Sequence, residues 1–349
     1  MTSPARPRAA VVGSMNTDLV VRCAQLPLPG ETVLGEDVLR LPGGKGANQA
    51  AALARLGLDC TMVSCVGTDE LGDWLLGTLG EVGADVSQVQ RSPRPTGTAF
   101  ITVDARGENE IVVSRGANAD LHLDGVDLEG FDVVLAQMEV SAEIVDEVAR
   151  RSSSLVLNVA PARPVPAATL ARCAVVIANE IEAQGLILEE LAHCVVTLGS
   201  RGAVHYSYGR ALFEAAPPRV DVIDTVGAGD VFCAAYCARF ALGDDPEHAL
   251  RFAVTAGALA TTALGAYTLC PALQILPEVG TLAAGLINAA VFLVKAVVGG
   301  VVYLPGIVNL WSSGTVCPLP GFGAPGPHVR VWGVRSVLTD YRAREHGFS

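Results

Sequence analysis

A glycine-rich turn between two aspartates precedes an apolar stretch, in the sequence DTVGAGDVFC at residues 224–233. Small residues at Gly227, Ala228 and Gly229 allow a ligand to approach closely, and N–H groups at the start of a helix attract anions. A carboxylate beside such an anion site can take a proton from a hydroxyl group during phosphoryl transfer. Asp230 is therefore a candidate general base, and the alternative interpretation is an acid that only caps the helix or belongs to its first turn.

Three other polar groups have spacings suited to a small polar ligand. Asn16 and Asp18 alternate in an extended run and so point the same way, as a pair for sugar hydroxyls; an Asx turn is the alternative. Glu139 ends an apolar strand, and acids at this position in open α/β sheets face the ligand crevice. The sequence GGKGANQA at 43–50 lacks the P-loop spacing, and its alternative interpretation is a flexible turn before a helix.

These residues need a scaffold, and the periodicity of the chain predicts one. Strand and helix patterns alternate repeatedly, which indicates an α/β fold with a doubly wound, mostly parallel sheet flanked by helices. One helix is expected to end at Gly57, and a strand, a turn and a helix start are expected over 220–230. Stretches near 18–42 and 97–116 do not follow this alternation, and we expect them to form a small β-sheet lid.

The net charge and the cysteines of the chain indicate which partners it can bind and in which cellular compartment it is located. The net charge of −12 over 349 residues argues against a nucleic-acid partner, but not against a phosphate held by backbone N–H groups. The nine cysteines include no CxxC pair, which favours a reducing cytoplasmic (or also nuclear) location. Cys233 and Cys237 are interpreted as core residues rather than metal ligands. We expect no secretory signal before the first strand.

The pattern changes after about residue 266. Residues 271–349 form an atypical apolar segment, rich in Pro and Gly, for which a poorly ordered or non-native tail, a packed extra helix and a membrane segment at 282–304 are open alternatives. Asn288 and Lys295 lie inside that stretch and no basic cluster flanks it, so we expect no membrane contact.

Eight segments in order resemble the ribokinase branch of the PfkB family of sugar and nucleoside kinases, and they run from about residue 9 to 266. They are VVGSMNTDLV, PGETV, LPGGKGANQAAALARLG, TGTAFITVDARGENEIVVSRGAN, NVAPAR, NEIEA, VTLGSRGA and DTVGAGDVFCAA. The resemblance implies a ribokinase-like kinase domain over 9–270. It also implies phosphorylation of D-ribose by ATP at the 5-hydroxyl, giving ribose 5-phosphate and ADP.

The resemblance implies a role for each matching residue. Asp230 would deprotonate the 5-hydroxyl, and the amides of Gly227, Ala228 and Gly229 would form the anion hole. The implied substrate-binding residues are Asn16, Asp18, Gly44, Lys45, Asn48, Glu139 and Asp230. The implied nucleotide-binding residues are Asn179, Thr197, Gly199 and Gly202. Glu182 would act on Mg²⁺ through water, and an activating K⁺ would be held by Asp224, Val226, Ala260 and Gly265. The lid would join two subunits in a homodimer.

The sequence departs from the family pattern at two places. Asn179 and Thr197 are only eighteen residues apart, so we expect one helix over 180–194 where relatives have two. Leu269 stands where relatives have a serine that helps to hold K⁺. Two alternatives therefore stay open: a sugar-binding protein with impaired catalysis, and a kinase of another pentose or of a nucleoside.

Overall fold

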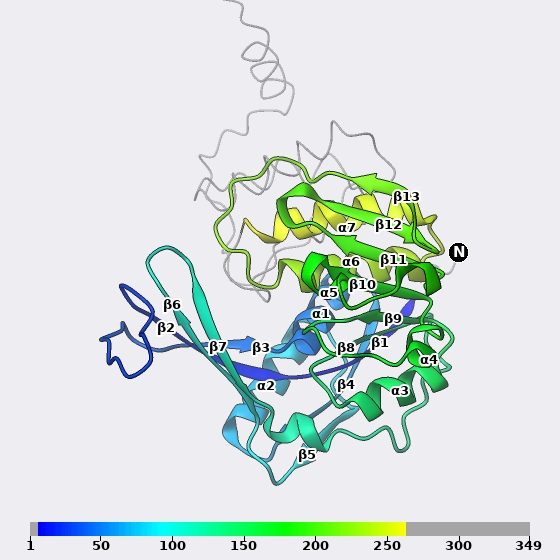
Figure 1. Ribbon diagram of the computed structural model, residues 1–349. Helices are drawn as coiled ribbons and strands as arrows, with labels where there is room; N and C mark the ends of the chain where they lie inside the picture. Colours follow the sequence, from blue (N-terminus) through cyan, green and yellow to red (C-terminus); the bar gives the residue numbers. More distant parts are fainter. Residues whose placement is uncertain (1–5, 263–349) are drawn as a thin grey trace, which may run out of the picture. The chain divides into compact units, whose positions relative to one another are not determined.

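A nine-stranded sheet forms the centre of the molecule in the computed structural model, which describes residues 6–262 (Figure 1). Its strand order is β13-β12-β11-β10-β9-β8-β1-β4-β5. The strands are β1 (Arg8–Val12), β4 (Asp59–Gly67), β5 (Val89–Ser92), β8 (Val133–Gln137), β9 (Leu155–Asn158), β10 (Val175–Asn179), β11 (Cys194–Thr197), β12 (Ala203–Ser207) and β13 (Arg210–Ala215). All neighbouring pairs from β5 to β11 are parallel, and β12 and β13 pair antiparallel.

Both faces of the sheet are covered, which explains why its strands are apolar along their whole length. In β1, Ala9 and Val11 pack into one core and Ala10 and Val12 into the other, all fully buried. A strand buried on both faces needs apolar residues at every position. This is the doubly wound, mostly parallel sheet that the sequence predicts.

Helices form a layer on each face of the sheet (Figure 1). The first layer holds α1 (Lys45–Arg55), α2 (Glu70–Glu81), α6 (Ala228–Ala241) and α7 (Pro246–Ala260). The second layer holds α3 (Ala142–Arg151), α4 (Ala167–Leu170) and α5 (Glu180–Ala183). Short 3₁₀ turns are η1 (Gly116–Asp120), η2 (Leu188–Glu190) and η3 (Gly199–Arg201).

Helix α6 packs against both α1 and α7 and is buried from Asp230 to Ala238. A helix enclosed on all sides has apolar residues around its whole circumference, and Cys233 and Cys237 are such core residues. The helix follows Gly227, whose φ of 77° places it in the left-handed region that glycine adopts without strain. Asp230 is thus an acid in the first turn of a buried helix.

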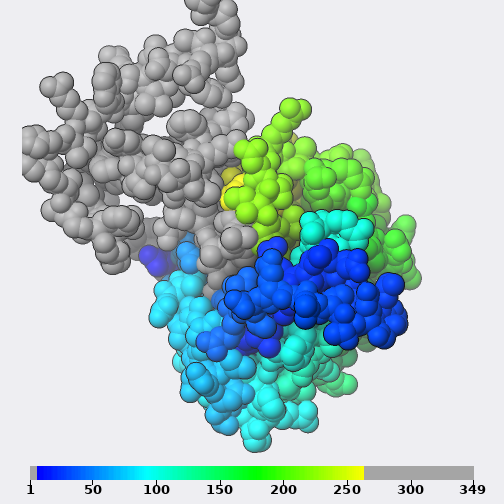
Figure 2. Space-filling view, turned by 90° about the vertical axis from the view of Figure 1, so that its left-hand side faces the viewer, coloured from blue at the N-terminus to red at the C-terminus, as the bar shows by residue number. Residues whose placement is uncertain are grey.

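A second sheet of four strands projects from the body in the order β3-β2-β6-β7 (Figure 1). Its strands are β2 (Asn16–Arg22), β3 (Leu39–Gly43), β6 (Gly97–Val103) and β7 (Asn109–Ser114). These strands agree to within two residues with the two stretches, near 18–42 and 97–116, for which the sequence predicts a small β-sheet. Figure 2 shows the residues near the N-terminus, in dark blue, gathered on the outer surface of one face. We call these four strands the lid sheet.

Two local expectations are wrong, and one observed element was not expected. Residues 220–223 form no strand, because the N–H groups of Ile223 and Asp224 donate to the carbonyl of Thr261 instead of to a neighbouring strand. The stretch 180–194 is not one helix but the short helix α5 and the 3₁₀ turn η2, with Gly185 in the connection between them. The β12–β13 hairpin has no counterpart among the expected elements.

Some expectations concern residues outside the described part of the chain. They include Gly265, Leu269, the segment 271–349 and the stretch 282–304 within it. Between residues 6 and 262, no helix combines the length and the apolar character needed to cross a membrane.

Candidate active site

The carboxylate of Asp230 is buried and held by two side-chain amides from α1. Asn48 Nδ2 donates to its Oδ2 at 2.9 Å, and Gln49 Nε2 donates to its Oδ1 at 3.1 Å. Burial raises the pKa of Asp230, whereas the nearby charge of Lys45 and the two amide hydrogen bonds oppose that rise. Asp230 is not the N-cap residue of α6, which is Gly227, but an acid in the first turn whose carboxylate accepts hydrogen bonds from α1.

Lys45 and Glu139 lie beside this carboxylate. The backbone N–H of Lys45 donates to Glu139 Oε2 at 3.1 Å, and the hydroxyl of Ser14 donates to the same oxygen. The charge of Asp230, more than that of Glu139, raises the pKa of Lys45. Glu139 follows β8 by two residues, at the carboxyl end of the sheet where open α/β folds bind ligands.

Asp18 brings a third carboxylate to the site from the lid sheet. Burial, followed by the charges of Glu139 and Asp230, raises the pKa of Asp18 to about 7. Asn16, two residues earlier on β2, is also buried, and its Oδ1 accepts from Asn118 Nδ2 at 2.8 Å. Neither residue forms an Asx turn, since both belong to a strand. Carboxylates and amides gathered in this way suit a ligand that carries several hydroxyl groups.

Glycines allow the lid strands and α1 to approach these side chains. A Cβ at Gly43 would lie 2.2 Å from Asp18 Oδ2, and one at Gly97 would lie 2.3 Å from Asn16 Oδ1. Gly44 has a φ of 88°, and a Cβ there would lie 2.8 Å from the backbone N of Asn16. The GGKGANQA sequence is thus a tightly packed entry to α1 rather than a flexible turn.

The residues expected to bind nucleotide lie at the carboxyl ends of β10 and β11. Asn179 and Thr197 are direct neighbours in the parallel register. Asn179 Oδ1 accepts from the N–H groups of Ile181 and Glu182, and Glu182 Oε2 accepts from the N–H of Asn179, which makes a capping box. Burial raises the pKa of Glu182, and the hydrogen bond from Asn179 and the charge of Lys45 oppose the rise, so Glu182 interacts electrostatically with the group around Asp230.

The turn after β11 carries the other two residues expected at the nucleotide. Gly199 and Gly202 have φ values of 59° and 95°, and the N–H of Leu198 donates to the carbonyl of Gly202 at 2.7 Å. A side chain at Gly202 would also collide with the backbone carbonyl of Ala215, 1.9 Å from its Cβ position. The local fold therefore requires glycine at position 202, and this requirement does not depend on a ligand.

Three of the residues expected around K⁺, which are Asp224, Val226 and Ala260, lie near the end of α7. Asp224 Oδ1 accepts from the N–H of Val226 at 3.0 Å, and the N–H of Asp224 donates to Thr261, the residue after Ala260. A helix carboxyl end presents backbone carbonyls, and together with a carboxylate these are ligands that a hard cation prefers. Over residues 6–262, no group of three or more His, Cys, Asp or Glu side chains is arranged to hold a metal ion.

Sequence reasoning missed Ser14 and the buried amides of Gln49, Gln137 and Asn158. Gln137 Nε2 donates to Gln49 Oε1 at 2.6 Å, and Gln49 Nε2 reaches Asn158 Oδ1 at 3.3 Å as well as Asp230. A polar residue at the end of an otherwise apolar strand, as in VVLAQ and LVLN, is a signal that could have found two of them.

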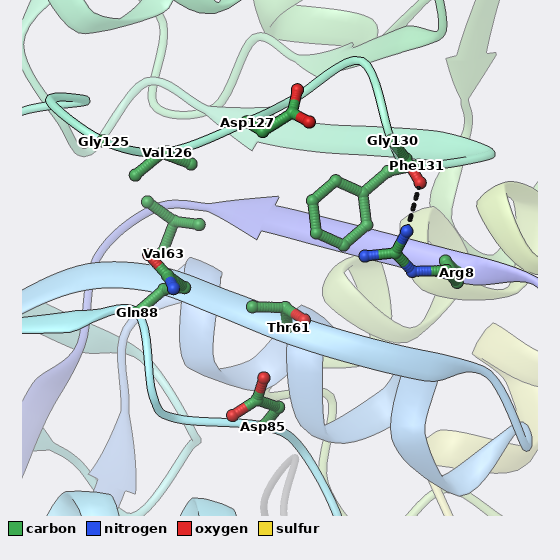
Figure 3. A pocket seen from close by; sticks show the side chains of 10 residues that line it. All are labelled: Arg8, Thr61, Val63, Asp85, Gln88, Gly125, Val126, Asp127, Gly130 and Phe131. Carbon is green, nitrogen blue, oxygen red and sulfur yellow. Dashed lines mark hydrogen bonds between the residues drawn. The ribbon is translucent and has the colours of Figure 1, made fainter.

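A separate cavity of about 260 Å³ lies toward the amino ends of β1, β4 and β8 (Figure 3). Arg8 and Phe131 stand at one side of it, where the guanidinium lies over the ring at 4.7 Å and donates to the carbonyl of Gly130. Glu139 and the candidate base lie beyond the opposite, carboxyl ends of the strands. The cavity is therefore not part of the candidate active site.

Comparison with known proteins agrees with this geometry. Residues 6–273 match the model of a family described as pfkB family carbohydrate kinase. The chain belongs to this family. Membership together with the similarity to ribokinases identifies it as an ATP-dependent sugar kinase.

Ribokinases are among the most similar members of the family. The chain is 41% identical to the ribokinase of Bacillus subtilis over 277 residues, which cover 73% of this chain and 93% of that protein. It is 32% identical to the ribokinase of Schizosaccharomyces pombe, over 75% of this chain and 94% of the relative.

Solved structures agree with the fold. The Arabidopsis thaliana ribokinase in complex with ribose and ATP has a TM-score of 0.72 and 28% identity, and covers 80% of this chain and 100% of its own. The Thermotoga maritima ribokinase has a TM-score of 0.71 and 30% identity, with 77% and 98% of the two chains covered. The large, mostly parallel sheet flanked by helices is thus that of the ribokinases.

Proposed function

We propose that this kinase phosphorylates D-ribose at the 5-hydroxyl, with ATP as the donor and ribose 5-phosphate and ADP as products. The observation that carries the proposal is the buried carboxylate of Asp230, held by Asn48 and Gln49 in the first turn of α6. Supporting it are the ribokinase relatives and the related structure that contains ribose and ATP.

The sugar would bind between the lid sheet and the start of α1. Polar groups from these two elements, from the end of β8 and from α6 would take the hydroxyls of ribose. They are Asn16, Asp18, Gly44, Lys45, Asn48, Glu139 and Asp230. Three carboxylates repel one another in this space, and sugar hydroxyls that donate to them relieve part of that repulsion.

Asp230 would act as the general base. It takes the proton of the 5-hydroxyl as that oxygen forms a bond to the γ-phosphorus of ATP, and the bond from that phosphorus to the bridging oxygen of ADP breaks. The carboxylate fits this task because donated hydrogen bonds from Asn48 and Gln49 favour its ionised form.

The start of α6 would hold the charge of the transferring phosphoryl group. First-turn N–H groups have no partner within their helix, and the helix dipole adds to their attraction for anions. We assign the anion hole to Gly227, Ala228 and Gly229. A Cβ at Gly229 would meet no atom within 4 Å, so space is open there, whereas the N–H of Ala228 donates to Thr225 at 3.3 Å and would exchange this partner for phosphate.

We assign the nucleotide to the carboxyl ends of β10 and β11. The residues are Asn179, Thr197, Gly199 and Gly202. Glu182 would contact Mg²⁺ through water, and its electrostatic interaction with Lys45 supports a location between the nucleotide and the sugar. Mg²⁺, when bound with ATP, neutralises phosphate charge.

An activating K⁺ would lie beside the start of α6. Asp224, Val226 and Ala260 fit a hard cation through carboxylate and carbonyl oxygens, and Gly265 would complete the set. A cation there would fix the loop that leads into the anion hole, since Val226 directly precedes Gly227.

The lid sheet would join two subunits in a homodimer. In its register, Asp18 lies opposite Leu41 and Ala99, and Ala99 lies opposite Val113, so these residues share one face. The exposed apolar side chains on that face are Leu39, Leu41, Ile111 and Val113. An exposed apolar sheet face is typical of a protein–protein interface.

The described cysteines are free, which supports the cytoplasmic location that we propose.

A coupled assay tests the proposal. Ribose, ATP, Mg²⁺ and K⁺ are supplied, and ADP and ribose 5-phosphate are measured. We expect both products in equal amounts. Ribose binding without ADP formation would favour a sugar-binding protein with impaired catalysis, and faster turnover of 2-deoxyribose, another pentose or a nucleoside would reassign the substrate.

A further inference from the structure

Three buried side-chain amides connect the candidate base to the centre of the sheet. Gln137 Nε2 donates to Gln49 Oε1 at 2.6 Å, and Gln49 Nε2 donates to Asp230 Oδ1 at 3.1 Å and to Asn158 Oδ1 at 3.3 Å. Gln49 and Gln137 have no exposed surface, and Asn158 is 7% exposed. We call Gln49, Gln137 and Asn158 the amide relay.

The chemistry of an ionised carboxylate sets the direction of every hydrogen bond in the relay. A carboxylate only accepts, so Gln49 must turn its NH₂ group toward Asp230. Its Oε1 then faces the other way and needs a donor, which Gln137 supplies. Gln137 keeps this direction although its own Oε1 has no hydrogen-bond partner within the described residues.

The relay is fixed at its far end by the sheet. Gln137 is the last residue of β8, and its Oε1 occupies the space that a Cβ would need at Gly13, 2.0 Å away. Asn158 ends β9 and donates to the carbonyl of Ile177 on β10 at 3.3 Å. Packing on these three neighbouring strands leaves the amide of Gln49 little freedom to turn.

Asp230 needs such support because its surroundings disfavour a negative charge. It is buried, and Glu139 raises its pKa further, while Asp18 and Cys233 are other acidic groups that interact with it. Lys45 is the cation that favours its ionised form, and Glu182 interacts in turn with Lys45. Amide donors offset the cost of burial without adding a charge.

We propose that Gln49, Gln137 and Asn158 are positioning residues of the phosphoryl transfer. The relay holds the carboxylate of Asp230 in one orientation and keeps it ionised, ready to accept the proton of the sugar hydroxyl. This role rests on the proposed function of Asp230 as the general base. None of the three residues needs to touch either substrate.

The change Gln49→Met tests the relay, because methionine has a similar volume and lacks the N–H donor. Losing a hydrogen bond to a charged group raises the pKa of a base by about one unit. In the pH profile of kcat/KM for ribose, we expect the acid limb to move up by about one pH unit. At pH values below the limb, kcat/KM should therefore fall about tenfold. The ribose KM should change less than about threefold, since Gln49 donates to the base rather than to the sugar.

Two further variants separate positioning from packing. Gln137→Met should shift the acid limb in the same direction by a smaller amount, and should add nothing to the shift once Gln49 is methionine. Independent packing effects would instead leave both limbs in place and lower the unfolding temperature additively. Gln88→Met, the same change at an exposed glutamine outside the site, should leave the profile unchanged.

The outcomes are distinct. If the wild-type enzyme is active and the acid limb of its pH profile coincides with that of Gln49→Met, the proposed role of the amide relay is wrong, but the proposed function is unaffected. A wild-type protein inactive on every pentose overturns the proposed function and the relay with it. If Gln49→Met does not fold, Gln137→Met is the deciding variant, because Gln137 has no direct contact with Asp230. An acid limb of kcat/KM at the wild-type pH in this variant would contradict the role of the amide relay.

Discussion

Asp18 is a half-buried carboxyl group, and the binding role that we propose for it would come at the expense of stability. Its pKa of about 7 in the folded protein lies above the ordinary 3.8. Below about pH 4 it is protonated in both the folded and the unfolded chain, and as the pH rises toward 7 the unfolded chain loses the proton first. The free energy of unfolding therefore falls with rising pH over this window.

We expect Asp18→Asn to remove this loss. The sugar-free variant should be more stable than wild type by about 1–3 kcal/mol at pH 8, and the difference should disappear near pH 4. Urea unfolding at several pH values measures it, and the variant should bind ribose more weakly. Asp37→Asn, an exposed carboxyl of the lid region, is the matched control. A difference that does not depend on pH would contradict the assignment.

Among single residues, the charged residues and the glycines next to them could be selected from the sequence as candidates for the site. The buried amides could not. Asp230 lies in the first turn of α6, Asp18 near the start of β2 and Glu139 just after β8, and in each case a charge next to an apolar run is visible in the sequence. Gln49 follows Asn48 within an alanine-rich helix, and nothing in that local pattern shows that its side chain meets β8 and β9, which are distant in sequence.

At the scale of elements, β2 and β3 of the lid sheet pair so closely that a side chain at position 43 would displace the carboxylate of Asp18. We expect Gly43→Ala to displace the Asp18 carboxylate, since its Cβ would lie 2.2 Å from Oδ2. The value of kcat/KM for ribose should fall at least about tenfold. Steady-state kinetics with ribose varied at saturating ATP measures the change.

Gly77→Ala is the matched control in α2. A Cβ at Gly77 would meet no atom within 4 Å, and alanine favours a helix over glycine. This variant should keep wild-type kinetics and gain about 0.5–1 kcal/mol of stability. Equal kinetics for Gly43→Ala and wild type would show that the contact between Gly43 and Asp18 does not matter for binding.

Elements with local signals were predictable, and those decided by distant contacts were not. Strand β1 and helix α1 have continuous apolar or alanine-rich sequences, and their expected positions agree with the structure. The sequence VDVI at 220–223 has the composition of a strand, yet Val222 and Ile223 are 61% and 52% exposed in an irregular segment. Backbone contacts with the end of α7 override that local preference.

At the scale of the whole molecule, the proposed homodimer depends on one face of the lid sheet. Ile111 lies opposite Ile101 on the face that also carries Asp18, whereas Val112 lies opposite Phe100 on the other face. Ile111→Glu should place a charge in the interface and shift the protein toward monomer, as measured by sedimentation velocity over a range of concentrations. Val112→Glu, a change at the neighbouring position with 68% exposure, should leave the dimer intact. The same distribution of species for both variants would argue against this interface.

The central claim is that Asp230 is the base of a sugar kinase. The most direct test combines the kcat of Asp230→Asn with calorimetric titration of the same variant with ribose. Asparagine keeps the shape but cannot accept the proton, so we predict that kcat falls about a thousandfold while the affinity for ribose stays within about threefold of wild type. A variant that keeps more than a tenth of the wild-type kcat would contradict the account.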